Sequence, residues 1–349
     1  MGSVLSSSIF ARLIGARRTV ALIGIPLLTF GVAGCGAIGG GSGDADLTIY
    51  SGRAESLVAD LITDFEDSSG LEVEVRYAET PELAAQLLEE GDSTSADVFY
   101  SQDGGALGAL SKEGLFTKLP DDLISAVDPK YRATDSTWVG VSGRARVFVY
   151  NPDEVEPPKS VYELTGPEWA GKVGYAPTNA SFQSFVTAMR VLAGEEKTRE
   201  FLIGLKQNGK VYEDNGVTLD AVEAGEISLG LVNHYYLFER QAEAGDTPLN
   251  TQMAFAEPGD PSSLINVAGV GILEGSDDLE AAEEFVTYLL SDEGQQFFAT
   301  TTFEYPLVAG IDAAEGVPPL SSIKGPKIDL SDLDDLQATQ ELLAEVGMI

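Results

Sequence analysis

The sequence predicts an α/β fold in which helices pack on sheets, built from about two domains. Short apolar strands alternate with amphipathic helices along most of the chain, and this alternation is typical of α/β proteins. The length supports two domains, because 315 of the 349 residues remain after the first 34 are set aside and a domain averages roughly 150 residues. Hydrophobic residues make up 44% of the chain, which is enough for buried cores.

The predicted elements follow one another closely from residue 47 onward. Residues 47–50 form an apolar strand, and apolar residues at helical spacing over 57–65 predict a helix that ends near Gly70. Residues 71–77 alternate as a strand with one solvated face, and Pro81 opens the next helix in its first turn. The same reasoning predicts strands at residues 96–100, 146–150, 172–175, 228–232 and 266–272. It predicts helices at residues 104–110, 182–192, 235–244, 279–290, 294–299 and 333–346.

Cys35 is the only cysteine, and it follows a segment with the features of an export signal. Residues 1–18 carry three arginines and no acidic residue, and an apolar run at 19–30 follows. That run is too short to span a bilayer. Residues 32–35, Val-Ala-Gly-Cys, resemble a lipobox, whose cysteine receives the lipid. We therefore expect a lipoprotein signal peptide over 1–34 and lipidation of Cys35, with an ordinary secretory peptide as the alternative.

The glycine-rich segment after Cys35 is typical of a flexible tether. We expect residues 35–46 to be the lipidated cysteine and its linker. No later stretch is long and apolar enough to cross a bilayer, so the lipid would be the only membrane attachment. The protein is then expected to be an exported monomer on the outer face of the cytoplasmic membrane, or a periplasmic lipoprotein.

The chain is strongly acidic, with 21 basic and 56 acidic residues and a net charge of −35 at pH 7. Nucleic acid is a poor partner for such a protein, because its phosphates are repelled. We interpret the acidic residues as a solvated surface that keeps an exported protein soluble. Attraction of cations to that surface is the alternative.

The sequence Asn233-His234-Tyr235-Tyr236 follows a predicted strand, at the kind of strand end where α/β proteins bind ligands. A phenolate oxygen is a hard anionic ligand, but free tyrosine titrates near 10. Only a strong cation such as ferric iron would make tyrosine a ligand near neutral pH. The alternative is that both tyrosines are core or rim aromatics.

Seven segments, taken in order, resemble the ferric-ion-binding proteins of bacterial ABC importers. They are residues 47–52 (LTIYSG), 96–101 (ADVFYS), 142–147 (SGRARV), 174–178 (GYAPT), 233–236 (NHYY), 304–307 (EYPL) and 347–348 (GM). The resemblance implies that ferric iron is captured by Tyr235 and Tyr236 and delivered to a membrane permease.

The same resemblance implies the periplasmic-binding-protein type II fold, with two α/β domains joined by hinge strands and a ligand cleft between them. The first domain is expected to comprise residues 47–143 plus 267–315. The second is expected to comprise residues 144–266 plus 316–349.

The chain departs from the family pattern at two ligand positions. Members with a four-residue protein shell add a histidine after the first strand and a glutamate after the second, where this chain has Ala54 and Gln102. The adjacent acids Glu55 and Asp103 are alternatives, although a shift of one residue turns a side chain elsewhere. Weak or indirect contributions are expected from Gln102, Asp103, Asn215, Asn233 and His234, with His234 at the rim or behind the ligands.

An anion is expected to complete the metal shell. Residues Thr178, Asn179, Ala180 and Ser181 precede a predicted helix, and free N–H groups at a helix start favour negative charge. The resemblance implies a synergistic anion there, with Arg144 nearby and Arg53 as an added cation. Carbonate, phosphate or a citrate-like anion would suit two arginines. Structural salt bridges are the alternative role for both.

The alternative function is the capture of a different solute. The same scaffold could capture another small solute, such as a polyamine, thiamine or a phosphonate. An enzyme is not expected, because the sequence holds no G-x-S-x-G, no H-E-x-x-H and no cysteine nucleophile beyond residue 35.

Overall fold

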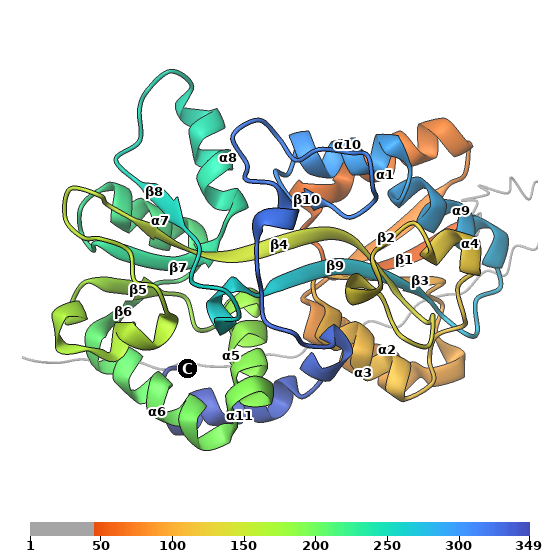
Figure 1. The fold of residues 1–349 in the computed structure, drawn as a ribbon. Coiled ribbons are helices and arrows are strands. Elements are labelled where there is room, and N and C mark those ends of the chain that lie inside the picture. Colours follow the sequence, from red (N-terminus) through yellow and green to blue (C-terminus); the bar gives the residue numbers. More distant parts are fainter. Residues whose placement is uncertain (1–44) are drawn as a thin grey trace, which may run out of the picture. The chain divides into compact units, whose positions relative to one another are not determined.

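The computed structural model describes residues 45–349 (Figure 1). The predicted signal peptide, Cys35 and the linker up to residue 44 lie outside the described residues. Strands and helices alternate through the described chain, so the predicted α/β class is confirmed.

One mixed sheet runs through both halves of the described chain, in the order β2-β1-β3-β9-β4-β7-β5-β6. Parallel pairs join β1 to β2 and β3, and join β5 to β6 and β7, whereas β9 and β4 run antiparallel to their neighbours. Short strands β8 and β10 also pair with β4. The strands are β1 Leu47–Ser51, β2 Val73–Tyr77, β3 Val98–Ser101, β4 Val139–Tyr150, β5 Val173–Tyr175, β6 Gly209–Val211, β7 Leu229–Asn233, β8 Gln252–Ala254, β9 Ile265–Ile272 and β10 Tyr305–Pro306.

Strand β4 links the two halves of the sheet. One half contains β1, β2, β3 and β9, and the other contains β5, β6 and β7. Its first part pairs with β9 through Ala145, and its second part pairs with β7 from Arg146 onward. Figure 1 shows β4 and β9 side by side across the middle of the molecule. The sequence predicted only residues 146–150 of this strand, because Gly140, Ser142 and Gly143 interrupt the apolar pattern of its first half. The predicted domain boundary after residue 143 therefore falls inside a continuous strand, and the division into two domains stays a prediction.

Helices cover both faces of the sheet (Figure 1). They are α1 Glu55–Ser69, α2 Thr80–Glu90, α3 Gly104–Lys112, α4 Asp121–Ile124, α5 Ala180–Ala193, α6 Glu195–Asn208, α7 Asn215–Glu223, α8 Tyr235–Ala244, α9 Leu279–Leu289, α10 Asp292–Thr300 and α11 Leu336–Glu345. The sequence missed α6 and α7. Charged residues dominate α6, yet Phe201, Leu202 and Leu205 lie on its buried side. Within residues 45–349, no helix combines the length and apolar character needed to span a bilayer.

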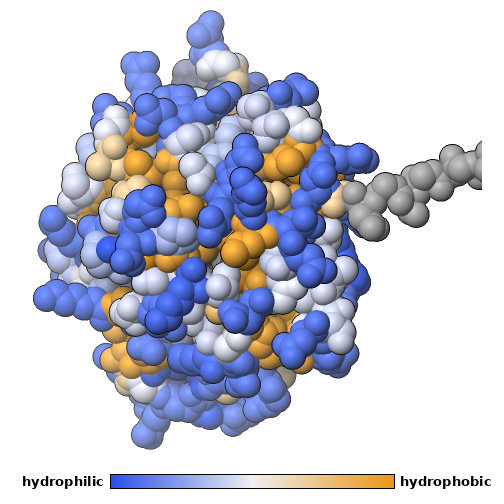
Figure 2. Space-filling model, turned by 90° about the vertical axis from the view of Figure 1, so that its right-hand side faces the viewer, coloured by the Kyte–Doolittle hydropathy of each residue, from blue (hydrophilic) through white to orange (hydrophobic). Residues whose placement is uncertain are grey.

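The surface is rich in polar side chains, and Figure 2 shows hydrophilic residues spread over the viewed face with small apolar areas between them.

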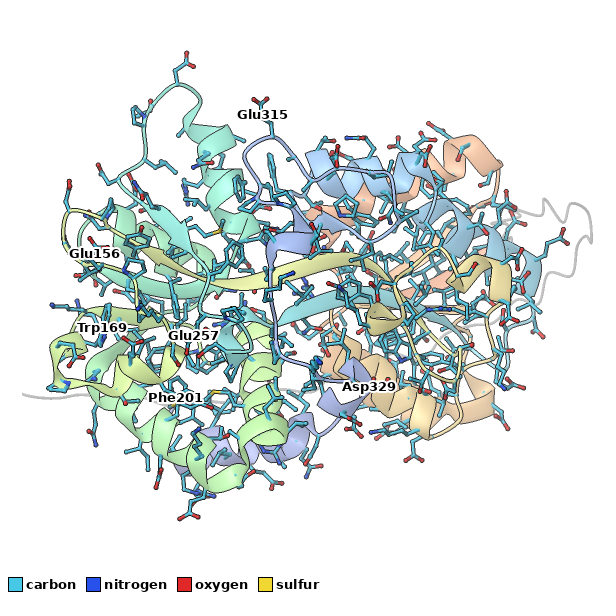
Figure 3. All side chains as sticks on the ribbon, viewed as in Figure 1. Glu156, Trp169, Phe201, Glu257, Glu315 and Asp329 are labelled. Carbon is cyan, nitrogen blue, oxygen red and sulfur yellow. The ribbon has the colours of Figure 1, made fainter. Side chains whose placement is uncertain are left out.

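Two hydrophobic cores lie beneath this surface. The smaller contains Phe148, Phe182 and Leu343, together with Trp169 and Phe201, which Figure 3 labels in the same part of the molecule. The larger core contains the apolar residues of β1, β3 and β9. The larger core also takes in apolar residues of β7 and α7, so the two cores do not divide the chain at its linking strands.

The C-terminal segment runs from one half of the molecule to the other (Figure 1). Leu330 and Leu333 belong to the larger core, whereas Leu343 belongs to the smaller one. The first contact requires small residues in α3, since a Cβ on Gly105 would lie 2.3 Å from the Leu333 carbonyl oxygen. This path differs from the prediction that residues 316–349 belong to the second domain alone.

Candidate metal and anion site

The paired tyrosines lie at a turn between a buried strand and a helix, where the sequence predicted them. Strand β7 ends at Asn233 and helix α8 begins at Tyr235. Tyr235 is 4% exposed and Tyr236 is partly buried. Their rings stack with centroids 4.4 Å apart and planes at 25°. The two phenols therefore approach one region of the molecule together.

His234 lies behind the tyrosines and not at a rim. It is fully buried, its Nδ1 accepts a hydrogen bond of 3.2 Å from the Ala145 backbone N–H, and its ring stacks on Tyr305 with centroids 4.4 Å apart. Burial lowers the pKa of His234 to about 3. The neutral imidazole therefore joins β4, β10 and the start of α8, which fixes the position of the tyrosine turn.

A buried carboxylate joins two arginines beside Tyr235. Glu304 Oε2 accepts hydrogen bonds from Arg53 Nη2 at 2.8 Å and from the hydroxyls of Ser142 and Thr302 at 3.1 Å each. Its Oε1 lies 3.7 Å from Arg144 Nε. Arg53 and Glu304 are each 1% exposed. Arg53 and Arg144 thus have the salt-bridge role that was the alternative to anion binding, although they share a single carboxylate.

The charges around Tyr235 affect its acidity. Burial raises the pKa of Tyr235 well above 10, neighbouring Tyr236 raises it further, and Arg144 lowers it. Burial lowers the pKa of Arg53, but the nearby Glu304 carboxylate more than offsets this and the net pKa is raised. Tyr235 is consequently a neutral phenol that loses its proton only to a strong cation.

At the two positions where the chain departs from the family's ligand pattern, the structure shows no free donor group on Ala54 and a hydrogen-bonded side chain on Gln102. Ala54 is exposed just before α1, and Gln102 Oε1 accepts a hydrogen bond of 3.4 Å from Arg53 Nη1. Arg144 Nη2 donates to the Gln102 carbonyl. Asp103 caps α3, with its Oδ1 accepting from the N–H groups of Gly105 at 2.9 Å and Ala106 at 3.1 Å. Through these two hydrogen bonds Asp103 stabilises the start of α3.

The predicted anion site lies at the start of α5. Asn179 caps the helix, with its Oδ1 accepting from the Ser181 N–H at 3.0 Å. Asn215 Nδ2 donates to Asn179 Oδ1 at 3.2 Å and to Ser181 Oγ at 3.1 Å. Asn215 is fully buried, and its Oδ1 has no hydrogen-bond partner within residues 45–349. The structure therefore brings Asn215 into the same group as Asn179 and Ser181.

Arg146 belongs to this group, although the sequence reasoning passed over it. Its Nη1 donates to Ser181 Oγ at 3.3 Å and its Nη2 donates to the Leu231 carbonyl at 3.0 Å. Among the described residues, no carboxylate pairs with Arg146, and burial lowers its pKa to about 9. The spacing of Arg144 and Arg146 within one strand could have revealed it, since residues two apart share a face.

A cavity of about 970 Å³ brings together predicted residues from both halves of the chain. Arg53 and Gln102 line it from one half, and Thr178, Asn179 and Ala180 line it from the other. A much smaller pocket is lined by Arg144, Arg146, Ser181 and Asn233, among other residues. Neither tyrosine lines the larger cavity.

Histidine and carboxylate ligands alone do not account for a metal site here. Within residues 45–349 no three His, Cys, Asp or Glu side chains are grouped closely enough to hold a metal ion.

Comparisons with known proteins identify the family to which the chain is similar. Residues 93–327 match the family model described as bacterial extracellular solute-binding protein. The chain is 34% identical over 309 residues to the major ferric iron-binding protein of Neisseria meningitidis, covering 87% of this chain and 93% of that one. It is 31% identical over 312 residues to the Fe(3+)-binding periplasmic protein of Serratia marcescens, covering 88% and 92%.

Solved structures resemble the whole described fold. Iron-bound HitA from Pseudomonas aeruginosa superposes with a TM-score of 0.81 at 32% identity, covering 86% of this chain and 99% of that one. A Trichodesmium protein solved with iron and citrate gives a TM-score of 0.73 at 27% identity, covering 86% and 99%. These neighbours are type II periplasmic binding proteins, which confirms the predicted fold. The chain belongs to the ferric iron-binding proteins of the bacterial extracellular solute-binding family, whose members bind solutes and are not enzymes.

Proposed function

We propose that this protein captures ferric iron outside the cytoplasmic membrane, together with a small anion or as an anionic chelate, and delivers it to an ABC permease. The observation that carries the proposal is the stacked pair Tyr235 and Tyr236 beside buried arginines that outnumber their carboxylate. Tyrosine is a ligand only for a cation that displaces its proton, and ferric iron is such a cation. Relatives named for ferric iron support the choice.

The charges of the site favour an anion with more than one negative charge. Arg53, Arg144 and Arg146 contribute three positive charges, and Glu304 contributes one negative charge. A ferric ion adds three positive charges and two phenolates remove two, so about three positive charges remain for the anion to balance. Citrate and phosphate meet this requirement better than a singly charged ion. A Trichodesmium relative solved with iron and citrate supports this class.

The same charges disfavour polyamines and thiamine, because the arginines repel cationic solutes. A phosphonate would suit the arginines without iron, and this is the alternative that the experiment must separate. The linking strand β4 provides for closure around either ligand.

Membrane anchoring is a separate part of the proposal. The sequence motif at residues 32–35 supports lipidation of Cys35 and tethering to the membrane. Two or more acyl chains hold a protein stably on a membrane, whereas one holds it only marginally. Membrane fractionation of Cys35→Ala tests this part, and an unchanged distribution would contradict it.

The iron proposal is tested by metal analysis and visible spectra of the protein with ferric iron and citrate, carbonate or phosphate. We expect a phenolate-to-iron band whose formation depends on the anion. Tyr235→Phe and Tyr236→Phe should each remove most of the band, because only the donor oxygen is lost. Tyr150→Phe is the control, since Tyr150 lies at the far end of β4 and its hydroxyl donates to Gln252. A colourless wild type that binds phosphonate would favour the alternative.

A further inference from the structure

Glu239 lies on the same helix as the paired tyrosines and on the same side. It follows Tyr235 by four residues and Tyr236 by three within α8, and residues at these spacings are neighbours on a helix surface. The sequence reasoning did not single it out. Its position makes it the nearest carboxylate along the chain to either tyrosine.

Helix α8 packs against the segment that carries Glu304. His234 stacks on Tyr305, and Phe238 stacks on Phe303 with centroids 6.4 Å apart. Glu304 lies between these two anchored residues in the chain, and Glu239 lies next to Phe238. These contacts hold α8, and Glu239 with it, against the segment that carries Glu304.

Glu239 is partly buried without a stabilising partner. Within the described part of the chain it makes neither an ion pair nor a side-chain hydrogen bond. The adjacent Arg240 instead pairs with Asp220 at 2.5 Å and Glu243 at 3.3 Å. Burial, together with the nearby Glu304 and Glu243 carboxylates, raises the pKa of Glu239 to about 7, although Arg53 and Arg240 act in the opposite direction. A carboxylate in this setting destabilises the unliganded protein.

A cation bound at the two tyrosines would balance the negative charge of the Glu239 carboxylate and remove this destabilisation. Tyr235 and Glu239 lie one helical turn apart on α8, and the charge of Glu304 raises the pKa of both side chains. Carboxylate oxygen is a hard donor and suits a hard trivalent ion. Gln102, at the position where the family resemblance implies a glutamate, is neutral.

Building on the proposed ferric function, we propose that Glu239 supplies a carboxylate oxygen to the ferric ion, so that one helix presents three oxygen donors. A rigid helix would hold Tyr235, Tyr236 and Glu239 in fixed relation. The added negative charge would leave about two positive charges for the bound anion to balance.

The test compares Glu239→Gln with Glu243→Gln, a matched change on the same helix at an exposed residue. Ferric affinity is measured by citrate competition, following the visible band at pH 7.5, and thermal unfolding is measured without iron. Glu239→Gln should weaken ferric affinity at least about tenfold and retain a visible band from the tyrosines. Its iron-free melting temperature should be unchanged or higher, because the repulsion by Glu304 is removed. Glu243→Gln should leave affinity within about twofold of the wild type.

Three outcomes would overturn the assignment. Equal ferric affinities for the two variants would exclude Glu239 as a donor and leave the iron proposal intact. Weaker binding by Glu239→Gln together with a lower iron-free melting temperature would indicate a structural role. A wild type without any visible band would overturn the iron proposal itself, and the donor role with it.

Discussion

The two ends of the candidate site handle positive charge in opposite ways. At the tyrosine end, Arg53 and Arg144 share the buried carboxylate of Glu304, which also accepts two hydroxyl hydrogen bonds. At the start of α5, Arg146 meets only neutral groups, namely the Ser181 hydroxyl and the Leu231 carbonyl. A compensated charge holds the structure together, whereas an uncompensated buried charge is available to a ligand.

This difference predicts that the arginines of the site contribute unequally to anion binding. Arg53 is held by Glu304 at 2.8 Å, so part of its charge is already neutralised within the protein. Arg146 lies against the rings of Phe182 and Phe185, at 5.3 and 5.1 Å from their centroids, which positions it without neutralising it. We expect the uncompensated end to determine anion affinity and the compensated end to determine stability.

The largest expected effect is on stability at the tyrosine end. Glu304→Gln leaves two buried guanidinium groups without a counter-charge, and loss of one partner from a buried pair costs about 3–5 kcal/mol. Urea unfolding measures the loss. Glu315→Gln, a change at the exposed residue labelled in Figure 3, is the control and should change stability by less than about 0.5 kcal/mol. Equal effects of the two variants would show that Glu304 does not compensate the arginines.

Acidification should destabilise the tyrosine end through His234. Its folded-state pKa of about 3 lies below the ordinary value of 6.5, so between these values the unfolded chain binds the extra proton. Stability is therefore lost as pH falls from 6.5 toward 3. His234 is the only histidine. In His234→Phe the slope of the unfolding free energy against pH should therefore decrease in this window, by up to the amount that corresponds to one bound proton. An unchanged slope would contradict the assignment of a neutral buried imidazole.

At the other end of the site, Arg146→Met should separate anion binding from stability. Loss of one charge-assisted hydrogen bond should weaken ferric binding in citrate or phosphate by roughly tenfold. Stability should change by less than about 1 kcal/mol or increase, because an uncompensated buried charge is replaced by an apolar side chain. Arg199→Met, at a surface arginine paired with Glu345, is the control. A large loss of stability in Arg146→Met would reverse the assignment of the two ends.

The smallest expected effect concerns the cap of α5. Asn179→Ala removes a side-chain cap and should cost about 1 kcal/mol, and it should also weaken the anion dependence of iron binding. Asp214→Ala removes the cap of α7, where Asp214 Oδ1 accepts from the Val217 N–H at 2.8 Å. It should cost a similar free energy and leave anion dependence unchanged. Identical anion dependence in both variants would remove the start of α5 from the anion site.

Much of the fold could be predicted from periodicity. The helix expected at residues 235–244 coincides with α8, and the strand expected at 47–50 differs from β1 by one residue. Helix α6 was missed because its charged residues hide a narrow buried stripe. The first half of β4 was missed because Gly140 and Gly143 interrupt the apolar run, although both residues are buried against their neighbours.

The residues of the candidate site were harder to predict from the sequence. Tyr235 and Tyr236 were found because they are adjacent at the end of a strand. Glu239 and Arg146 were missed because their significance depends on groups they meet, or fail to meet, in space. Asp103 shows the converse, since a residue weighed as a metal ligand is used as a helix cap.

The sequence by itself determined the alternation of strands and helices, the tyrosine pair at a strand end and the helix that follows Thr178. These features arise from hydrogen bonding and side-chain spacing over a few residues, so local patterns are enough to predict them. Only the tertiary structure decided which charges are compensated. Arg53 and Glu304 are 251 residues apart in the chain, whereas Arg146, two residues from Arg144, has no acidic partner among the described residues. Compensation depends on distance and burial in the folded chain, because an ion pair is strong only where water is excluded.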